Sequence, residues 1–369
     1  MSFNDKLISK GVSRRDFMKL CTMVTATFGL SNTLAPKVAE ATENAASKPA
    51  VVWLEGQDCA GCSTSFLSSL NPSPGEVILD MISLKFHEVI MAASGHQAEE
   101  YLHETVKKGG YVLVVEGSIP TADDRYCVVG GKNFIDTFKE AAAGASAIIA
   151  LGACATYGGF VKVGPTKGVG VADIIKDVPE LKDKPVINIP GCPAKPSWLI
   201  ATVLHYITFG TVPELDADLR PKAFFSSLLH DNCPRRGHFE NGNFTTDWND
   251  PEETKWCLLL MGCKGPKTFT DCAQVWWNDG ANFCINAGSP CAGCTQKEFY
   301  GDFTPLYEKQ DMFKMPGLGG IDADKAGKVL GGAAAVAVGA HLAASVATGR
   351  IGKKQDHADA KGKGKEGRE

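Results

Sequence analysis

The sequence lacks a large excess of charge of either sign. Its 38 Lys and Arg residues and 42 Asp and Glu residues give a formal net charge of −4 over 369 residues, and the basic residues are scattered except in residues 350–369. A nucleic-acid-binding protein usually carries a basic patch or stripe on its folded part. We therefore expect no nucleic-acid partner.

The sequence also lacks internal repeats and a complete dinucleotide fingerprint. Gly168-Val169-Gly170 comes nearest to one, but it has no third glycine and does not directly follow a convincing strand. Nicotinamide binding is therefore not expected.

What the chain does have is cysteine, and four of its thirteen cysteines lie just beyond short apolar runs. Those four are Cys59, Cys62, Cys154 and Cys192. The apolar runs span 51–54, 111–115, 147–151 and 186–189, and segments of helical character between them span 97–108, 133–143 and 169–176. Apolar strands that alternate with helices predict a doubly wound α/β fold with a parallel sheet. Ligands of such sheets bind beyond the carboxyl ends of the strands, so we expect the four thiols at that edge.

The spacing of these four cysteines is typical of a metal centre. A single cysteine is often only a small buried hydrophobe, but four at one sheet edge are better explained as ligands. A C-x-x-C pair joined by two distant cysteines suits tetrahedral zinc or a cubane iron–sulfur cluster, and the spacing does not choose between them.

The N-terminus predicts export. Ser13 to Lys19 reads S-R-R-D-F-M-K, a twin-arginine pattern, and is followed by a mostly apolar stretch at 20–34 and an A-x-A site at 39–41. We interpret residues 1–41 as a twin-arginine signal peptide, the alternative being an ordinary basic amphipathic start. Export with many cysteines would normally suggest disulfides. However, a chain of this length with 44% apolar residues can bury a large core, and the twin-arginine route takes folded cargo, so metal is favoured over disulfides.

A second group of candidate ligands follows residue 216. His230 and Cys233 form an H-x-x-C pair, and Cys291 and Cys294 form a second C-x-x-C pair. Between the two pairs lie Cys257, Cys263, Cys272 and Cys284. The surrounding chain has little sustained periodicity and is rich in Trp, Gly, Asn and Asp, which is typical of a small domain folded around inorganic centres.

Six short motifs in order carry a resemblance to a known family. They are the C-x-G-C pair after V-V-W-L-E-G, E-G-S-I-P at 116–120, G-A-C at 152–154, I-P-G-C-P at 189–193, H-x-x-C at 230–233 and G-C-K-G-P at 262–266. Together they resemble the small, electron-transfer subunit of nickel–iron hydrogenases, over a stretch from the signal to about Tyr300. The resemblance implies a flavodoxin-like domain at 48–215, then a small, irregular cluster-binding domain at 216–315. It also implies a large-subunit partner that holds the nickel–iron site where dihydrogen is cleaved.

The same resemblance implies the ligands of three clusters. Cys59, Cys62, Cys154 and Cys192 would bind the proximal [4Fe-4S] cluster, next to the large subunit. His230, Cys233, Cys257 and Cys263 would bind the distal [4Fe-4S] cluster. Cys272, Cys291 and Cys294 would bind the medial one.

Two positions differ between branches of that family. Most members have a proline where this chain has Cys284, and their medial cluster is [3Fe-4S]; a cysteine there resembles the selenium-containing branch and predicts a medial [4Fe-4S] cluster of lower potential. The alternative is a [3Fe-4S] cluster with Cys284 as a spectator. Oxygen-tolerant members carry two extra cysteines near the proximal cluster, where this chain has Gly61 and Lys162, so an ordinary four-cysteine proximal cluster is expected.

Three other residues are assigned as follows. Cys21 lies in the predicted signal, and Cys127 is expected to be a structural thiol. Glu116 either hydrogen-bonds near the proximal cluster or seats the partner, or else it is a solvated or capping side chain.

The C-terminus predicts a membrane anchor. After a linker at 316–328, residues 329–349 carry no formal charge and are long enough to cross a bilayer as a helix, although they are rich in Ala and Gly. The basic tail at 350–369 would stay on the cytoplasmic side while the globular part faces the periplasm. The alternative is a flexible Ala/Gly linker with a solvated basic tail.

The sequence therefore predicts the small subunit of a membrane-anchored hydrogenase on the periplasmic face. It would relay electrons from the large subunit to a membrane cytochrome b, a quinone-linked subunit or a cytochrome c. One alternative is an iron–sulfur subunit of another exported oxidoreductase, such as a relative of the quinone-reductase subunit. A non-enzymatic alternative is an exported structural protein held by zinc or disulfides.

Overall fold

The computed structural model describes residues 48–309 and 323–350. Residues up to Gln310 belong to one compact unit, and those from Asp311 belong to a second. The predicted signal peptide, most of the 316–328 linker and the basic tail after Arg350 lie outside the described residues, and the boundary at 215/216 stays a prediction.

The first part of the chain folds around a five-stranded parallel sheet, as predicted. Its strands are β1 (Ala50–Glu55), β2 (Ser83–His87), β3 (Tyr111–Glu116), β6 (Ala145–Leu151) and β7 (Val186–Ile189). Their order is β2-β1-β3-β6-β7, and every pairing is parallel. This is the strand order of flavodoxin-like folds, in which the order reverses between the first and third strands of the sheet.

The edge strand β2 lies outside the four predicted runs. Its sequence, S-L-K-F-H, mixes polar and apolar residues, and only Phe86 and His87 are buried. A half-exposed edge strand has no continuous apolar run to mark it.

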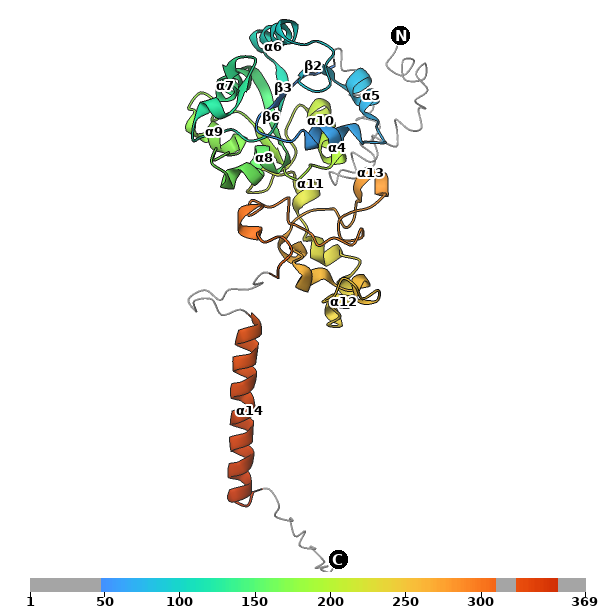
Figure 1. Ribbon diagram of the computed structural model, residues 1–369, viewed down its shortest axis with the longest axis vertical. Helices are drawn as coiled ribbons and strands as arrows, with labels where there is room; N and C mark the ends of the chain where they lie inside the picture. The colour runs from blue at the N-terminus through green and yellow to red at the C-terminus, as the bar shows by residue number, and fades with distance from the viewer. Residues whose placement is uncertain (1–47, 310–322, 351–369) are drawn as a thin grey trace, which may run out of the picture. The chain divides into compact units, whose positions relative to one another are not determined.

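Helices cover both faces of the sheet, and alternate strand residues serve the two faces. Val52 and Leu54 of β1 pack with α6 (His96–Lys108), α7 (Phe134–Gly144) and α9 (Val171–Asp177). Val51 and Trp53 pack with α4 (Gly61–Leu67) and α10 (Pro196–Phe209) on the opposite face (Figure 1). The predicted helices 97–108, 133–143 and 169–176 are thus confirmed to within a few residues.

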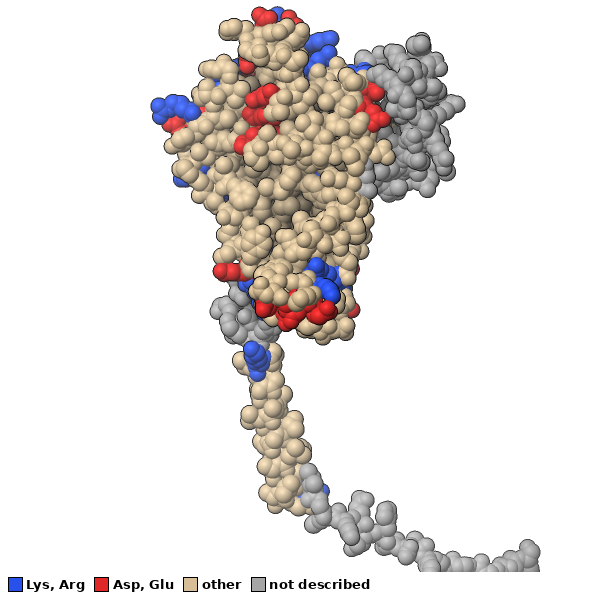
Figure 2. Space-filling model, turned by 45° about the vertical axis from the view of Figure 1, so that its right-hand side comes forward, with Lys and Arg blue, Asp and Glu red and all other residues tan. Residues whose placement is uncertain are grey.

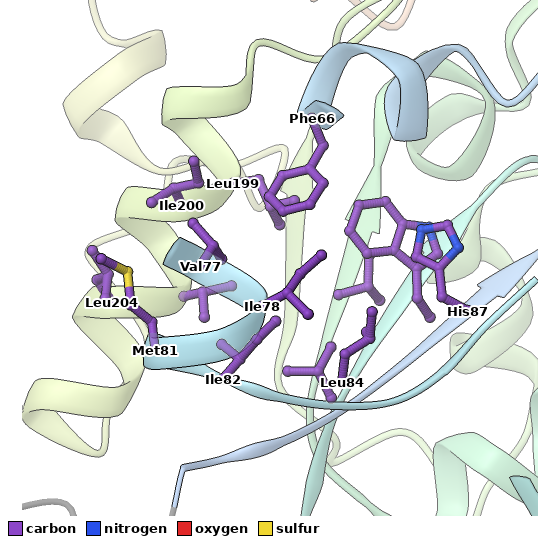
Figure 3. Close-up of a pocket in the computed structure, with 14 residues that line it drawn as sticks. Phe66, Val77, Ile78, Met81, Ile82, Leu84, His87, Leu199, Ile200 and Leu204 are labelled. Atoms are coloured by element: carbon purple, nitrogen blue, oxygen red, sulfur yellow. The ribbon is translucent and has the colours of Figure 1, made fainter. Parts of the chain in front are cut away.

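A small apolar cavity of about 30 Å³ remains on the α4 and α10 face. Side chains of the π-helical turn η2 (Val77–Met81) and of α10 converge on it together with Phe66, and His87 lies at one side (Figure 3). The His87 ring is fully buried, with its centroid 4.6 Å from that of Trp53. Because burial penalises the charged imidazolium, the pKa of His87 falls to about 4.

Between α10 and residue 309 the described helices are all short turns. They are α11 (Lys222–Phe225), η5 (Leu229–Asn232), α12 (Arg236–Glu240), η6 (Glu253–Lys255), η7 (Leu258–Met261), η8 (Gly265–Lys267), α13 (Trp277–Gly280) and η9 (Gly301–Phe303). Their small core consists of Leu229, Leu258, Phe283, Ile285 and Cys291. A core this small suits the predicted irregular domain organised around bound centres.

The second unit contains one long helix, α14 (Ala323–Ala347). Within it, Gly327–Ala347 is 21 residues long with a mean hydropathy of 1.8, which is long and apolar enough to cross a membrane. Figure 2 shows no charged side chain along most of this helix.

Candidate metal centres

The four cysteines predicted to gather at the sheet edge line one pocket. Cys59 comes from the β1–α4 connection, Cys62 from the first turn of α4, Cys154 from α8 (Gly152–Tyr157) and Cys192 from the loop after β7. The pocket lies at the carboxyl ends of β1, β3, β6 and β7, where doubly wound sheets bind their ligands. We name these four residues the first cysteine set.

Two glycines allow the thiols of this set to approach the backbone closely. Gly152 has φ +87°, and a Cβ there would lie 2.5 Å from Sγ of Cys62. Gly159 has φ +54°, and a Cβ there would lie 2.6 Å from Sγ of Cys154. Any larger residue would therefore clash with a thiol as well as straining the backbone.

The thiols of the first set lie close to one another; Cys62 is buried and Cys154 partly buried, while Cys59 and Cys192 are exposed. Burial raises the pKa of Cys154 to about 12, and the neighbouring Cys192 and Cys59 contribute to the rise. Burial also raises the pKa of Cys62, although the Ala194 N–H donates a hydrogen bond to its Sγ at 3.4 Å. Thiols in such surroundings ionise readily only when a cation binds them, so the donor set fits a metal centre.

His230, Cys233, Cys257 and Cys263 line a second pocket, and we name them the histidine set. Burial lowers the pKa of His230, and Arg236 lowers it further, which favours the neutral imidazole that binds metal. The Cys263 thiol accepts an N–H at 3.4 Å from Gly265.

The last four cysteines, Cys272, Cys284, Cys291 and Cys294, also come together, and we name them the third set. The thiol of Cys291 interacts electrostatically with Cys294 and Cys284, and the thiol of Cys294 interacts with Cys272 and Cys284. Cys284 is exposed, while Cys291 is buried. The structure thus brings Cys284 close to Cys291 and Cys294, two of the three cysteines with which its ligand role was predicted.

Direct contacts join the three sets in a fixed order. The thiol of Cys294 in the third set lies close enough to Cys192 of the first to interact with it electrostatically. Nζ of Lys195, three residues beyond Cys192, lies 2.7 Å from Oδ1 of Asp271, which precedes Cys272. The backbone N–H of Lys264, next to Cys263 of the histidine set, donates to the carbonyl of Cys291 in the third set at 2.7 Å, and the thiols of Cys263 and Cys291 interact electrostatically. The third set therefore lies between the other two.

The donor types of the three sets limit the kind of metal centre that each set could hold. Across residues 48–309 and 323–350, no three His, Cys, Asp or Glu side chains lie close enough together to hold one metal ion. All twelve described cysteines are free thiols. Four soft donor side chains, as each of the three sets offers, suit either tetrahedral zinc or a cubane iron–sulfur cluster.

Some neighbours of the thiols carry no sequence signal of their own. The Thr270 hydroxyl lies 3.1 Å from Sγ of Cys272, and Trp277 packs in the same apolar cluster as this cysteine. Lys195 and Asp271 form a buried ion pair beside them. The only local hint is that Lys195 and Asp271 lie three and one residues from candidate ligands. Cys127, the remaining cysteine, is half-buried beside the core of the α6 and α7 face.

Two protein families match the chain, and together they cover both groups of cysteines. Residues 225–307 match the family that describes the C-terminal part of the NiFe/NiFeSe hydrogenase small subunit. Residues 59–206 match the NADH ubiquinone oxidoreductase 20 Kd subunit family.

Three hydrogenase small subunits align with most or nearly all of the chain. The uptake hydrogenase small subunit of Azotobacter vinelandii is 39% identical over 97% of this chain and 98% of its own length. The hydrogenase-2 small chain of Escherichia coli K12 is 40% identical over 97% and 99%. The periplasmic [NiFe] hydrogenase small subunit of Solidesulfovibrio fructosivorans is 44% identical over 82% and 95%.

Solved structures give the same result. A chain of the [NiFeSe] hydrogenase of Desulfomicrobium baculatum superimposes with a TM-score of 0.67 at 35% identity, covering 72% of this chain and 100% of that one. A chain of the actinobacterial-type NiFe-hydrogenase of Ralstonia eutropha H16 has a TM-score of 0.65 at 25% identity, covering 85% and 95%.

Proposed function

Since this chain belongs to the small subunits of nickel–iron hydrogenases, we propose that its three ligand sets hold the three iron–sulfur clusters of that family at the positions described above. Such a subunit is part of an oxidoreductase that acts on dihydrogen, and the active site lies in the large subunit with which it pairs. The clusters carry electrons one at a time, and the protein positions them and tunes their potentials.

The first cysteine set holds the proximal [4Fe-4S] cluster, and the histidine set holds the distal [4Fe-4S] cluster. The third set holds the medial cluster, a [4Fe-4S] centre with Cys284 as its fourth ligand. The observation that carries this assignment is that Cys294 neighbours Cys192 and that Cys291 neighbours the Cys263–Lys264 segment. These neighbours support a relay in which the third set is the middle centre.

Iron analysis and electron paramagnetic resonance of the complex, purified together with its large subunit, test the assignment. Because the large subunit adds one active-site iron, that iron is subtracted first. About twelve cluster irons and no oxidised [3Fe-4S] signal are expected for three cubanes. About eleven cluster irons with that signal would make Cys284 a bystander, and zinc without iron would overturn the relay altogether.

The match of residues 59–206 to a quinone oxidoreductase subunit favours a common fold for the first cysteine set. The match of residues 225–307, with relatives that align over nearly the whole chain, favours hydrogenase over that alternative.

In this proposal the protein acts at the periplasmic face of the cytoplasmic membrane. It is exported by the twin-arginine pathway and anchored by the helix Gly327–Ala347. The periplasmic relative and the length of this helix support that location.

Replacing both Arg14 and Arg15 by Lys should leave the complex in the cytoplasm. A chain that ends at residue 322 should instead be exported but be recovered in the soluble periplasmic fraction. If the truncated chain stays with the membranes, the helix is not the anchor.

Beyond the large subunit, the electron partner is a membrane cytochrome b, a quinone-linked subunit or a cytochrome c. The apolar helix supports a partner in the membrane. Co-purification of the full chain and of the chain ending at 322, followed by haem absorption spectra, separates the membrane partner from a soluble one.

A further inference from the structure

A buried ion pair joins the loops that carry two of the ligand sets. Nζ of Lys195 lies 2.7 Å from Oδ1 of Asp271, and the Lys195 side chain is 1% exposed. Lys195 is three residues beyond Cys192 of the first set, and Asp271 immediately precedes Cys272 of the third. The two residues are 76 positions apart in the chain, so the pair is a tertiary link.

Further contacts hold the two charged groups of the pair in place. Lys195 Nζ also donates to the carbonyl of Val275 at 2.7 Å, and Oδ1 of Asp271 also accepts from Nε1 of Trp198 at 2.9 Å. Nζ lies 4.8 Å from the centroid of the Trp198 ring, within the range of a cation–π contact. The charges are therefore held in one geometry.

Both charges lie next to Cys272, because Asp271 immediately precedes it in the chain and Nζ of Lys195 is held 2.7 Å from Oδ1 of Asp271. A nearby positive charge favours a metal-bound thiolate and a nearby negative charge opposes it, so the two charges have opposite effects on the same centre. A charge that is fixed close to a metal-bound sulfur in a poorly solvated region changes the potential of the centre.

Stability alone is a weak reason for such a pair. A buried ion pair loses hydration free energy that its attraction often does not recover, and apolar residues of similar volume are often equally stable. The pair's position between two ligand loops offers a functional reason instead.

We propose that Lys195 and Asp271 are a positioning pair that ties the Cys192 loop to the Cys272 loop and sets the reduction potential of the medial centre. This inference rests on the cluster assignment above. The transfer from the first set to the third moves one electron, with no bond made or broken and no proton required at either residue. The pair thus acts as a fixed electrostatic bias on that transfer.

The test is a set of charge variants in the whole complex, titrated potentiometrically with resonance spectra recorded for each centre. Lys195→Met leaves Asp271 uncompensated, so the medial centre should become harder to reduce. At a fixed applied potential its reduced-to-oxidised ratio should fall about tenfold, which corresponds to about 59 mV for one electron. Asp271→Asn should shift the ratio in the opposite direction.

Two further variants separate charge from folding. Lys195→Arg keeps the charge and should keep the wild-type potential, and the double variant Lys195→Met with Asp271→Asn should return to within about threefold of the wild-type ratio. Lys184→Met is the matched control, because Lys184 donates to the Ala143 and Ala145 carbonyls where β6 begins, at the sheet end away from the cysteines. It should leave all three potentials unchanged.

The inference would be overturned if Lys195→Met and Asp271→Asn shifted the medial potential in the same direction. It would also be overturned if neither variant shifted that potential while retaining its full iron content. These results differ from failure of the cluster assignment. In that case the wild-type complex itself would lack three distinct iron–sulfur signals.

Discussion

An oxygen of the Glu116 carboxylate lies 2.9 Å from the backbone nitrogen of Cys62 and accepts its N–H. The same carboxylate accepts from the Ser63 hydroxyl at 2.6 Å and from Nε1 of Trp53 at 3.3 Å. Glu116 ends β3, while Cys62 lies in the first turn of α4, a helix whose own N-cap residue, Ala60, provides no side-chain cap. Glu116 is therefore a buried cap for the helix that follows the C-x-x-C pair, which agrees with the capping interpretation, although the carboxylate is not solvated.

Replacing Glu116 by Gln tests this role. The amide keeps the volume but loses the charge that favours a helix N-terminus, and its NH2 group cannot accept, so we expect the free energy of unfolding to fall by about 1–3 kcal/mol. Chemical denaturation of the isolated complex measures it. Glu76→Gln is the control, because Glu76 caps the more exposed turn α5 (Pro74–Glu76), and its effect should be about 1 kcal/mol or less. An equal effect at both positions would contradict the special role of Glu116.

Replacing Cys284 by Ala should convert the medial centre to a three-iron cluster. Because Cys284 lies with Cys291 and Cys294 but is the exposed member of the set, its loss should remove about one iron of about twelve and leave the other centres intact. A new oxidised [3Fe-4S] signal and a higher medial potential are the expected measurements. Cys127→Ala is the control and should leave the iron content and spectra as they are. An unchanged spectrum in Cys284→Ala would show that Cys284 is no ligand.

Replacing His230 by Cys should lower the potential of the distal centre. A neutral imidazole, which burial favours at this position, would be exchanged for an anionic thiolate, and added negative charge makes a cluster harder to reduce. Potentiometric titration should show the shift at one centre only. His238→Gln, in the nearby helix α12, is the control. If all three potentials move together in His230→Cys, the shift has another origin.

His87 and Glu55 should make opposite contributions to the pH dependence of stability. Burial lowers the pKa of His87 to about 4, so its contribution is present above pH 6.5 and is lost as the pH falls towards 4. Burial raises the pKa of Glu55 to about 7, so its contribution is present below pH 4.5 and is lost as the pH rises through 7. Nδ1 of His87 lies 3.6 Å from Oε1 of Glu55, and the two slopes oppose each other between pH 4.5 and 6.5.

Single variants should reveal each slope. Relative to the wild type, Glu55→Gln should gain stability as the pH rises from 4.5 to 7, and His87→Gln should lose it as the pH rises from 4 to 6.5. The free energy of unfolding measured across this range under anaerobic conditions checks both. If the free energy of unfolding of both variants depends on pH in the same way as that of the wild type, neither group titrates as its burial implies.

Much of this protein follows from local sequence. The buried strands β1, β3, β6 and β7 are marked by continuous apolar runs, because a parallel sheet covered on both faces needs no polar residues in its interior. The cysteines after β1, β6 and β7 could then be assigned to one sheet edge, since parallel strands present their carboxyl ends together. The 21-residue uncharged run likewise predicted the helix that Gly327–Ala347 forms.

Tertiary structure decided what depends on contacts between distant residues. The edge strand β2, the cap of Cys62 by Glu116 and the pair of Lys195 with Asp271 each join segments that have no periodic or spacing signal in common. The same holds for the order of the three ligand sets, which depends on the contacts of Cys192 with Cys294 and of Cys291 with Cys263. The residue types and local spacing in the sequence determine which side chains are able to bind a metal centre, but only chain packing brings such distant side chains and backbone groups within hydrogen-bonding distance.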